Sequence, residues 1–272
     1  MLNRPGPLLA VVLAALALDA SPAVATGIDA NTDLMLHLDG GFGDSSTYGR
    51  TTTLAGSPTI DAGTTKFGAG AARFNGNGQG VYYDVATLTY PYTVDLWVRF
   101  NSFTAYDNIF GRFDTILLHM NNNGGGTGTR FDVQQMNGGL GAGTFTSAVS
   151  AVVNTWYHLA LVMTAKTAGT FYVNGNPETI SFGAAFGSWG HLGTSTSFDF
   201  GTFDPANGYG VDGWLDEVRV SMGVARYSGA FTPPTAPYDT STAPEPASAA
   251  LLALCGAGAA ASSLRRRAGR RP

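Results

Sequence analysis

The stretch from Asp212 to Tyr238, DGWLDEVRVSMGVARYSGAFTPPTAPY, constrains the fold of this chain more than any other. Its first part alternates with period two, and one face of the predicted strand carries Trp214, Asp216, Val218 and Val220. Three of these four are apolar, so we expect this face to look into the core, with Asp216 a buried carboxylate that needs a partner. The prolines near the end of the stretch forbid further ladder pairing, which predicts the last strand of a β domain.

Other segments also carry strand patterns. Residues 92–100 alternate cleanly between apolar and polar side chains, and Asn174-Gly175 is a typical tight hairpin turn. Glycine is abundant, charged residues are only 12 % of the chain, and no helical period extends beyond a turn or two. We therefore predict an all-β domain of roughly a dozen strands packed as a two-sheet antiparallel β-sandwich. Further strands are expected at 34–38, 80–85, 108–120, 129–136 and 156–164.

Several segments, in order, resemble the signatures of bacterial laminin-G-like domains, which are concanavalin A-like jelly rolls. They read HLDG, KFGAGAARFNG, YTVDLWVRF, NTWYHLALVMT, FYVNGN and GWLDEVRVS followed by GVARY and PP. Only the region 111–150 drifts from the pattern. The resemblance implies a jelly roll whose first and last strands lie side by side, which would bring Asp39 close to Asp212 and Asp216.

The N-terminus has the form of a secretory signal peptide. Arg4 precedes an apolar run, residues 8–18, that is too short to span a bilayer comfortably. Ala23-Val24-Ala25 supplies the small residues that signal peptidase reads. We expect cleavage after Ala25 and export of the chain.

The C-terminus carries a second targeting signal. Pro244-Glu245-Pro246 precedes an apolar segment and a basic end with five arginines, and this order resembles the PEP-CTERM sorting tail that exosortase-type enzymes of Gram-negative bacteria process. The resemblance implies transient membrane anchoring and delivery to the cell surface or extracellular polysaccharide; a simple C-terminal anchor is the alternative. The predicted organisation is a signal peptide (1–25), the jelly-roll domain (27–240), a linker (241–246), a transmembrane segment (247–264) and a basic cytoplasmic tail (265–272).

The exported part is acidic. Residues 27–243 hold 9 basic and 17 acidic side chains, a net charge of 9 − 17 = −8. This balance argues against nucleic acid or anionic lipid as a partner. The one cysteine, Cys255, lies in the tail segment, so the domain has no disulfide and must be held by its core.

Two kinds of site are candidates. A structural Ca²⁺ ion, which prefers six to eight oxygen ligands, would take carboxylates from Asp39, Asp44, Asp212 and Asp216. The alternative for Asp216 is that it accepts backbone N–H groups from a neighbouring loop. A ligand-binding face would combine aromatic and charged side chains, with the candidates Trp97, Arg99, Trp189 and Tyr209. Core packing is the alternative role for Trp97 and the one we favour, and we assign Trp156 and Trp214 to the core.

Catalysis is not expected. A retaining glycosidase needs two carboxylates about 5 Å apart, and the alternation of WLDEV places Asp216 and Glu217 on opposite faces. The four histidines show no metal-ligand spacing. The sequence thus predicts an exported binding or adhesion module for an extracellular glycan or surface protein. A structural matrix component without a discrete ligand, or a divergent glycoside hydrolase, are the alternatives.

Overall fold

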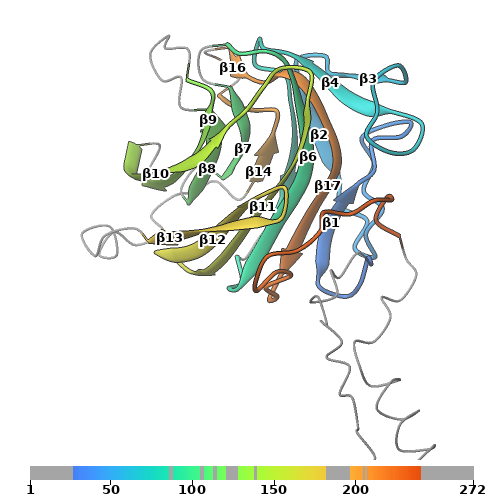
Figure 1. Ribbon diagram of the computed structural model, residues 1–272. Coiled ribbons are helices and arrows are strands. Elements are labelled where there is room, and N and C mark those ends of the chain that lie inside the picture. The colour runs from blue at the N-terminus through green and yellow to red at the C-terminus, as the bar shows by residue number, and fades with distance from the viewer. Residues whose placement is uncertain are drawn as a thin grey trace, which may run out of the picture.

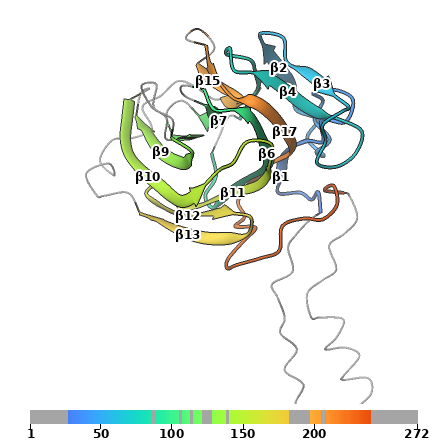
Figure 2. The same cartoon turned by 45° about the horizontal axis from the view of Figure 1, so that its top comes forward.

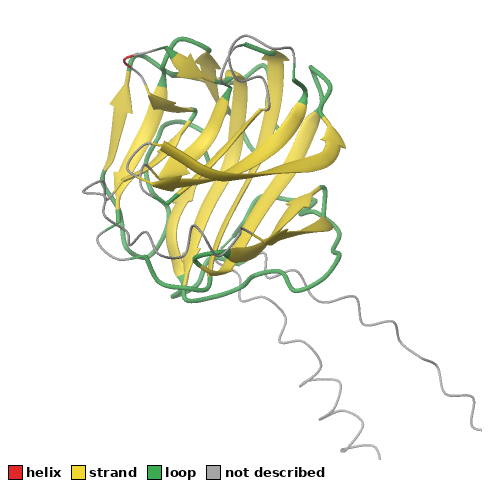
Figure 3. Cartoon of the chain, turned by 90° about the vertical axis from the view of Figure 1, so that its left-hand side faces the viewer, coloured by secondary structure: helices red, strands yellow, loops and turns green. Residues whose placement is uncertain are grey.

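The computed structural model describes residues 27–85, 88–104, 107–112, 115–120, 128–137, 140–181, 197–204, 206 and 208–239. These residues form strands and loops without an α-helix, as predicted, and the strands stack in two layers (Figure 3). No helix within the described ranges is long and apolar enough to cross a membrane. The predicted signal peptide, linker and apolar tail lie outside the described residues.

One layer is an eight-stranded antiparallel sheet with the order β13-β12-β11-β6-β17-β4-β3, in which β1 also pairs with β17 (Figure 1). Its strands are β1 (Thr32–Leu36), β3 (Thr59–Asp61), β4 (Ala71–Asn75), β6 (Tyr92–Ser102), β11 (Trp156–Ala165), β12 (Ala168–Val173), β13 (Asn176–Ser181) and β17 (Asp212–Met222). The pairing of β1 with β17 confirms that the first and last strands lie side by side.

The other layer is a seven-stranded antiparallel sheet with the order β10-β9-β8-β7-β14-β5-β2. Its strands are β2 (Thr52–Ala55), β5 (Gly80–Asp84), β7 (Asn108–Arg112), β8 (Ile116–Met120), β9 (Arg130–Asn137), β10 (Leu140–Ser150) and β14 (Ser197–Phe200). A small ladder joins β15 (Thr202–Asp204) to β16 (Tyr209–Gly210). The single strand expected over 108–120 is a hairpin of β7 and β8.

The main core fills the space between the two sheets, and β6 shows why. Its alternate residues Tyr92, Val94, Leu96, Val98 and Phe100 are all buried in this core, as the period-two pattern predicts. The Asn174-Gly175 turn between β12 and β13 is also confirmed, since both residues have positive φ, 50° and 78°.

A second, smaller apolar cluster lies on the outer face of the eight-stranded sheet. Residues 223–239, here called the C-terminal strap, follow β17 across this face (Figures 1 and 2). Tyr227 and Phe231 of the strap stack with ring centroids 3.9 Å apart and pack on Tyr172. The strap ends beside the start of the domain, where Ile28 N donates to Asp239 O at 2.7 Å.

A buried ion pair lies beneath the strap. The side chains of Asp95 and Arg219 are fully buried, with Arg219 Nη2 2.6 Å from Asp95 Oδ2. The hydroxyls of Tyr227 and Tyr238, both from the strap, donate to the same carboxylate oxygen. The cost of burying these charges is thus offset by pairing and by hydrogen bonds from the covering segment.

Candidate functional site

A β-bulge in β17 sets the geometry of the site. Glu217 has φ +49°, and the register with β6 shifts between Asp216, opposite Trp97, and Arg219, opposite Asp95. β17 therefore has one residue more than β6 at this point. The inward and outward alternation of its side chains is shifted by one residue beyond the bulge. Ahead of the bulge Leu215 faces the core, whereas after it Val218 does.

The bulge corrects the predicted alternation of β17. Trp214 and Asp216 do not share the core face with Val218 and Val220, because the four residues lie on both sides of the phase change. Trp214 is buried as expected, but on the outer face, where its Nε1 donates to Asp61 Oδ2 at 2.8 Å. A bulge depends on the partner strand, so the alternation alone carries no sign of it.

Asp216 is a fully buried carboxylate next to the bulge. Its Oδ2 accepts hydrogen bonds from the backbone N–H groups of Lys66 and Phe67 at 2.8 and 3.1 Å. This is the alternative arrangement that the sequence analysis left open. Its Oδ1 has no hydrogen-bond partner among the described residues. Burial outweighs the two backbone donors and raises the pKa of Asp216 to about 7.

Glu217, the bulged residue, links three segments. Its Oε1 lies 2.8 Å from Nδ1 of His37, just after β1, and its Oε2 accepts from Tyr238 N of the strap at 2.8 Å. The hydrogen bond to Glu217 raises the pKa of His37, although partial burial opposes this. Neither Asp216 nor Glu217 belongs to the core between the sheets, and both contact segments on the outer side of the eight-stranded sheet. The expectation that they lie on opposite faces of the strand was therefore wrong.

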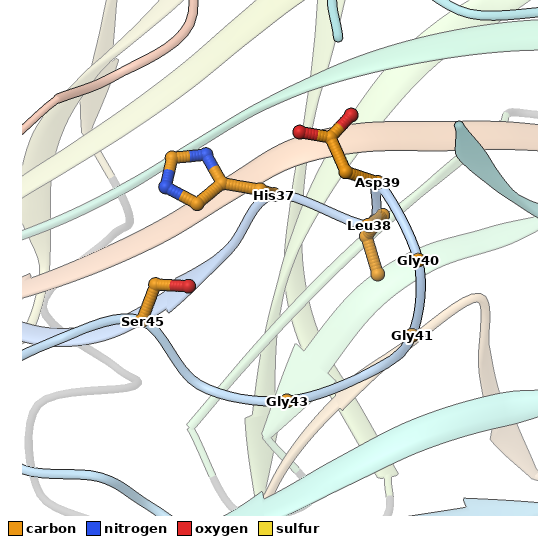
Figure 4. A pocket seen from close by; sticks show the side chains of 7 residues that line it. All are labelled: His37, Leu38, Asp39, Gly40, Gly41, Gly43 and Ser45. Carbon is orange, nitrogen blue, oxygen red and sulfur yellow. The ribbon is translucent and has the colours of Figure 1, made fainter. Parts of the chain in front are cut away.

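A pocket of about 250 Å³ opens beside His37 (Figure 4). The chain curves around it through three glycines, and a Cβ added at any of them would meet nothing within 4 Å. The pocket is lined by His37, Leu38, Asp39, Gly40, Gly41, Gly43 and Ser45. It combines an imidazole, a carboxylate and a hydroxyl with exposed backbone, a chemistry that suits a small polar ligand.

Asp39 fixes one wall of this pocket to the neighbouring loop. Its Oδ1 accepts hydrogen bonds from the backbone N–H groups of Ala69 and Gly70. Gly68 makes this approach possible, because it has φ +56° and an added Cβ would lie 1.9 Å from Asp39 Oδ1. The Asp39 carboxylate is therefore partly engaged by protein donors.

The other two carboxylates predicted to bind Ca²⁺ also have protein partners. Asp44 accepts hydrogen bonds from the backbone N–H groups of Met35, Ser46 and Arg50. Asp212 pairs with Arg73 at 2.6 Å and accepts further hydrogen bonds from side chains of β6. Over the described part of the chain, no three His, Cys, Asp or Glu side chains group closely enough to hold a metal ion. The four predicted ligands are thus not brought together, and calcium binding stays a prediction.

The residues predicted to bind a ligand do not form one exposed face, although Trp97 and Arg99 lie two positions apart on β6. Trp97 is 5 % exposed and packs against His158, with ring centroids 5.1 Å apart, and Lys66 Nζ lies 3.9 Å from its ring centroid. Arg99 is partly exposed and donates to Asn154 Oδ1 at 3.1 Å. Tyr209 lies on β16, and Trp189 lies outside the described residues.

One aromatic residue of this face was missed by the sequence analysis. Trp156, assigned to the core, is only partly buried, and its neighbour Tyr157 occupies the core position. The register places Trp156 directly opposite Arg99. The alternation of β11 could have shown this, because Tyr157, Leu159 and Leu161 carry the apolar face.

These features define a class: a two-sheet antiparallel jelly roll with a small polar pocket at the end of its first strand. The model of the concanavalin A-like lectin/glucanases superfamily, in its laminin-G type, matches residues 74–226, more than half of the chain. The chain belongs to this superfamily, which confirms the resemblance seen in its sequence. No curated protein matches it.

Solved structures share the fold at low identity. Domain 4 of AbnA, an extracellular arabinanase from Geobacillus stearothermophilus in complex with arabinotriose, is 19 % identical, with a TM-score of 0.51 over 79 % of this chain and 98 % of that one. The binding domain of botulinum neurotoxin serotype G is 14 % identical, with a TM-score of 0.52 over 72 % of this chain. The present chain covers about half of the neurotoxin chains, 49 % in that example.

Proposed function

We propose that this protein is an exported, non-catalytic binding module whose ligand is an extracellular glycan or a surface protein. The observation that carries the proposal is the pocket beside His37, with polar side chains and glycine backbone around an open volume. Hydroxyl-rich ligands bind through such convergent donors and acceptors.

The comparisons support a glycan as the ligand. The arabinanase domain was solved with arabinotriose, and for botulinum neurotoxin type C, cell entry depends on interaction with two ganglioside molecules. Both share the fold of the present chain, with TM-scores of 0.51 and 0.50.

The geometry around the bulge supports a role without catalysis. Asp216 and Glu217 are 0 % and 1 % exposed, and protein groups bind both carboxylates. A glycosidase needs one carboxylate to attack the sugar and another to protonate the leaving group. Buried carboxylates cannot reach a glycosidic bond, so this pair does not supply that chemistry.

The proposal includes the targeting signals read from the sequence. Signal peptidase would remove residues 1–25, and an exosortase-type enzyme would process the tail after Pro244-Glu245-Pro246. The module would then act at the surface of a Gram-negative bacterium or in its extracellular polysaccharide. Immunoblotting of fractions from cells that make the unmodified chain or the tail variant Pro246→Ala tests this. Unchanged delivery of the variant to the surface would refute the sorting role.

Glycan-array binding of the purified full-length protein tests the ligand class. The substitution Gly41→Leu adds a large side chain to the lining of the pocket, and the position can accept it because an added Cβ would meet nothing within 4 Å. Gly229→Leu is a matched control on the strap, also with free space. We expect Gly41→Leu to weaken glycan binding at least about tenfold, a change of about 1.4 kcal/mol, and Gly229→Leu to leave it intact. Equal binding by both variants would exclude the pocket, and the absence of any glycan or protein ligand would favour the structural-matrix alternative.

Calcium is a separate prediction. Melting the protein with and without a chelator tests for a structural ion, since an ion that binds only the folded state raises the midpoint. An unchanged midpoint would count against it.

A further inference from the structure

The outer face of the eight-stranded sheet is covered over only part of its length. Near the strap, outward side chains such as Asp95, His158 and Arg219 are 0 % exposed. The rings of Tyr227 and Phe231 lie against His158, with centroids 6.2 and 5.6 Å from it. Toward the other end of the same strands, outward residues remain partly exposed.

That open end carries an alternation of arginine and tryptophan across four neighbouring strands, here called the Arg–Trp row. The register places Arg73 of β4 opposite Trp214 of β17, Trp214 opposite Arg99 of β6, and Arg99 opposite Trp156 of β11. Three inter-strand steps of about 4.8 Å make the row about 14 Å long.

Three side chains of the row contact one another. The guanidinium carbons of Arg73 and Arg99 lie 4.7 and 5.2 Å from the ring centroid of Trp214. Arg99 and Trp156 are both partly exposed and lie opposite each other, so part of a guanidinium and part of an indole are accessible side by side. Among the described residues Arg99 has no carboxylate partner, and Asn154 Oδ1 uses only one of its donors.

The charges along the row balance. Arg73 pairs with Asp212, and Asp61 accepts a hydrogen bond from Trp214 Nε1. Two arginines are therefore matched by two nearby carboxylates, within a domain whose net charge is −8 over residues 27–243. Such a surface gives a polyanion no net attraction, whereas it offers donors, acceptors and a flat aromatic face together.

We propose that the Arg–Trp row is a second binding site, for a run of uncharged sugar rings within a neutral glycan chain. Trp156 stacks against one ring, and Arg99 donates hydrogen bonds to the hydroxyl oxygens of that ring or the next. The site is distinct from the pocket beside His37, and it rests on the proposed glycan-binding function. It replaces the buried Trp97 with Trp156 as the stacking residue of this face.

Calorimetric titration of the full-length protein with cellohexaose, xylohexaose and mannohexaose tests the site, with oligogalacturonate as the acidic counterpart. We expect at least one neutral probe to bind with an affinity that salt does not change, because no charges attract it. Trp156→Ala should weaken that binding about tenfold, and Arg99→Gln should weaken it several-fold. Leu54→Ala, an exposed truncation on the other sheet, is the control and should have no effect.

The outcomes separate this inference from the proposed function. Neutral binding that Trp156→Ala and Arg99→Gln leave unchanged, or binding of oligogalacturonate alone, overturns the Arg–Trp row as a neutral-glycan site. If Gly41→Leu abolishes glycan binding and the row variants do not, the Arg–Trp row is also overturned, and the pocket beside His37 remains the binding site. Binding of no probe by the unmodified protein overturns the Arg–Trp row, whereas the proposed function falls only if the protein also binds no glycan on the array and no surface protein. Trp156→Phe keeps an aromatic face and should bind with intermediate affinity, which guards against misfolding of the alanine variant.

Discussion

Replacing Arg219 by methionine leaves the Asp95 carboxylate buried without its counter-charge. In the intact protein this carboxylate accepts two hydrogen bonds from Arg219, at 3.0 and 2.6 Å, and two from strap tyrosines. Neither side chain of the ion pair is exposed, so water cannot replace the guanidinium. Methionine retains much of the packing volume, and the substitution therefore isolates the loss of charge pairing.

The expected cost is large. Removing one partner of a buried ion pair typically lowers the free energy of unfolding by about 3–5 kcal/mol. Asp95 keeps the two tyrosine hydroxyls, which places our expectation near the lower end, about 3 kcal/mol. Globular domains have only about 5–15 kcal/mol in total, so the variant should fold but unfold at a much lower denaturant concentration.

Equilibrium urea unfolding, followed by tryptophan fluorescence, measures this change as a shift of midpoint at constant slope. The double variant Asp95→Asn/Arg219→Met removes both charges, while the asparagine oxygen still accepts from the tyrosines. It should be more stable than Arg219→Met by at least about 1 kcal/mol. A loss below about 1 kcal/mol for the single variant, or no recovery in the double, would refute the reasoning.

The pH dependence provides a second measurement. Burial alone raises the pKa of Asp95, but the charge and hydrogen bonds of Arg219 outweigh it and hold the pKa below its usual value. A carboxylate of this kind stabilises the fold above its unfolded-state pKa, about 3.9, and loses this contribution as the pH falls through the folded-state pKa. In Arg219→Met the charge and hydrogen bonds of Arg219 are gone, and the burial effect is opposed mainly by the strap tyrosine hydroxyls. The loss of unfolding free energy in Arg219→Met should therefore become smaller toward acid pH. A loss that does not depend on pH would contradict the role given to the Asp95–Arg219 ion pair.

Three further predictions follow from the structure. Because the pKa of Asp216 is raised to about 7, the free energy of unfolding should fall as the pH rises from about 4 to about 7. Asp216→Asn should flatten this pH dependence of the urea midpoint, and an unchanged slope would contradict the prediction. Gly175→Ala places a Cβ 1.8 Å from Phe231 O and should cost more than about 3 kcal/mol. Gly223→Ala is also at positive φ, but its Cβ would lie no closer than 4.0 Å to Thr89 Cγ2, so it should cost about 1 kcal/mol; equal thermal shifts would refute the contact. Leu215→Ala, in the main core, should cost about 2–5 kcal/mol in the same assay, and a change under 1 kcal/mol would place Leu215 outside the core.

Local sequence patterns were sufficient to predict most of the strands and turns. The alternation of residues 92–100 predicts β6 and its core face, and Asn174-Gly175 predicts the hairpin of β12 and β13. These features depend on pleat geometry and on the φ preferences of one or two residues, which the chain carries locally. The resemblance to laminin-G-like domains also implied that the first and last strands are neighbours, which the pairing of β1 with β17 confirms.

The candidate sites were less predictable, because burial on the outer face depends on segments distant in sequence. Trp97 was proposed to contact a ligand, but the loop at Lys66 and Phe67 and the neighbouring His158 enclose it. The outward direction of Trp156 could be read from the alternation of β11, but its partial exposure beside Arg99 could not. No pattern within a single strand reveals which end of a sheet face another segment will cover.

The sequence by itself determined an acidic, disulfide-free, two-sheet antiparallel sandwich that closes with the strand around Asp216. Only the tertiary structure decided where the polar groups of that strand point. The bulge at Glu217 changes the phase of β17 halfway along, and the strap then buries one part of the outer face and leaves the Arg–Trp row open. Period two is a property of an unbroken strand, whereas a bulge and a covering segment come from the partners that the strand meets after folding.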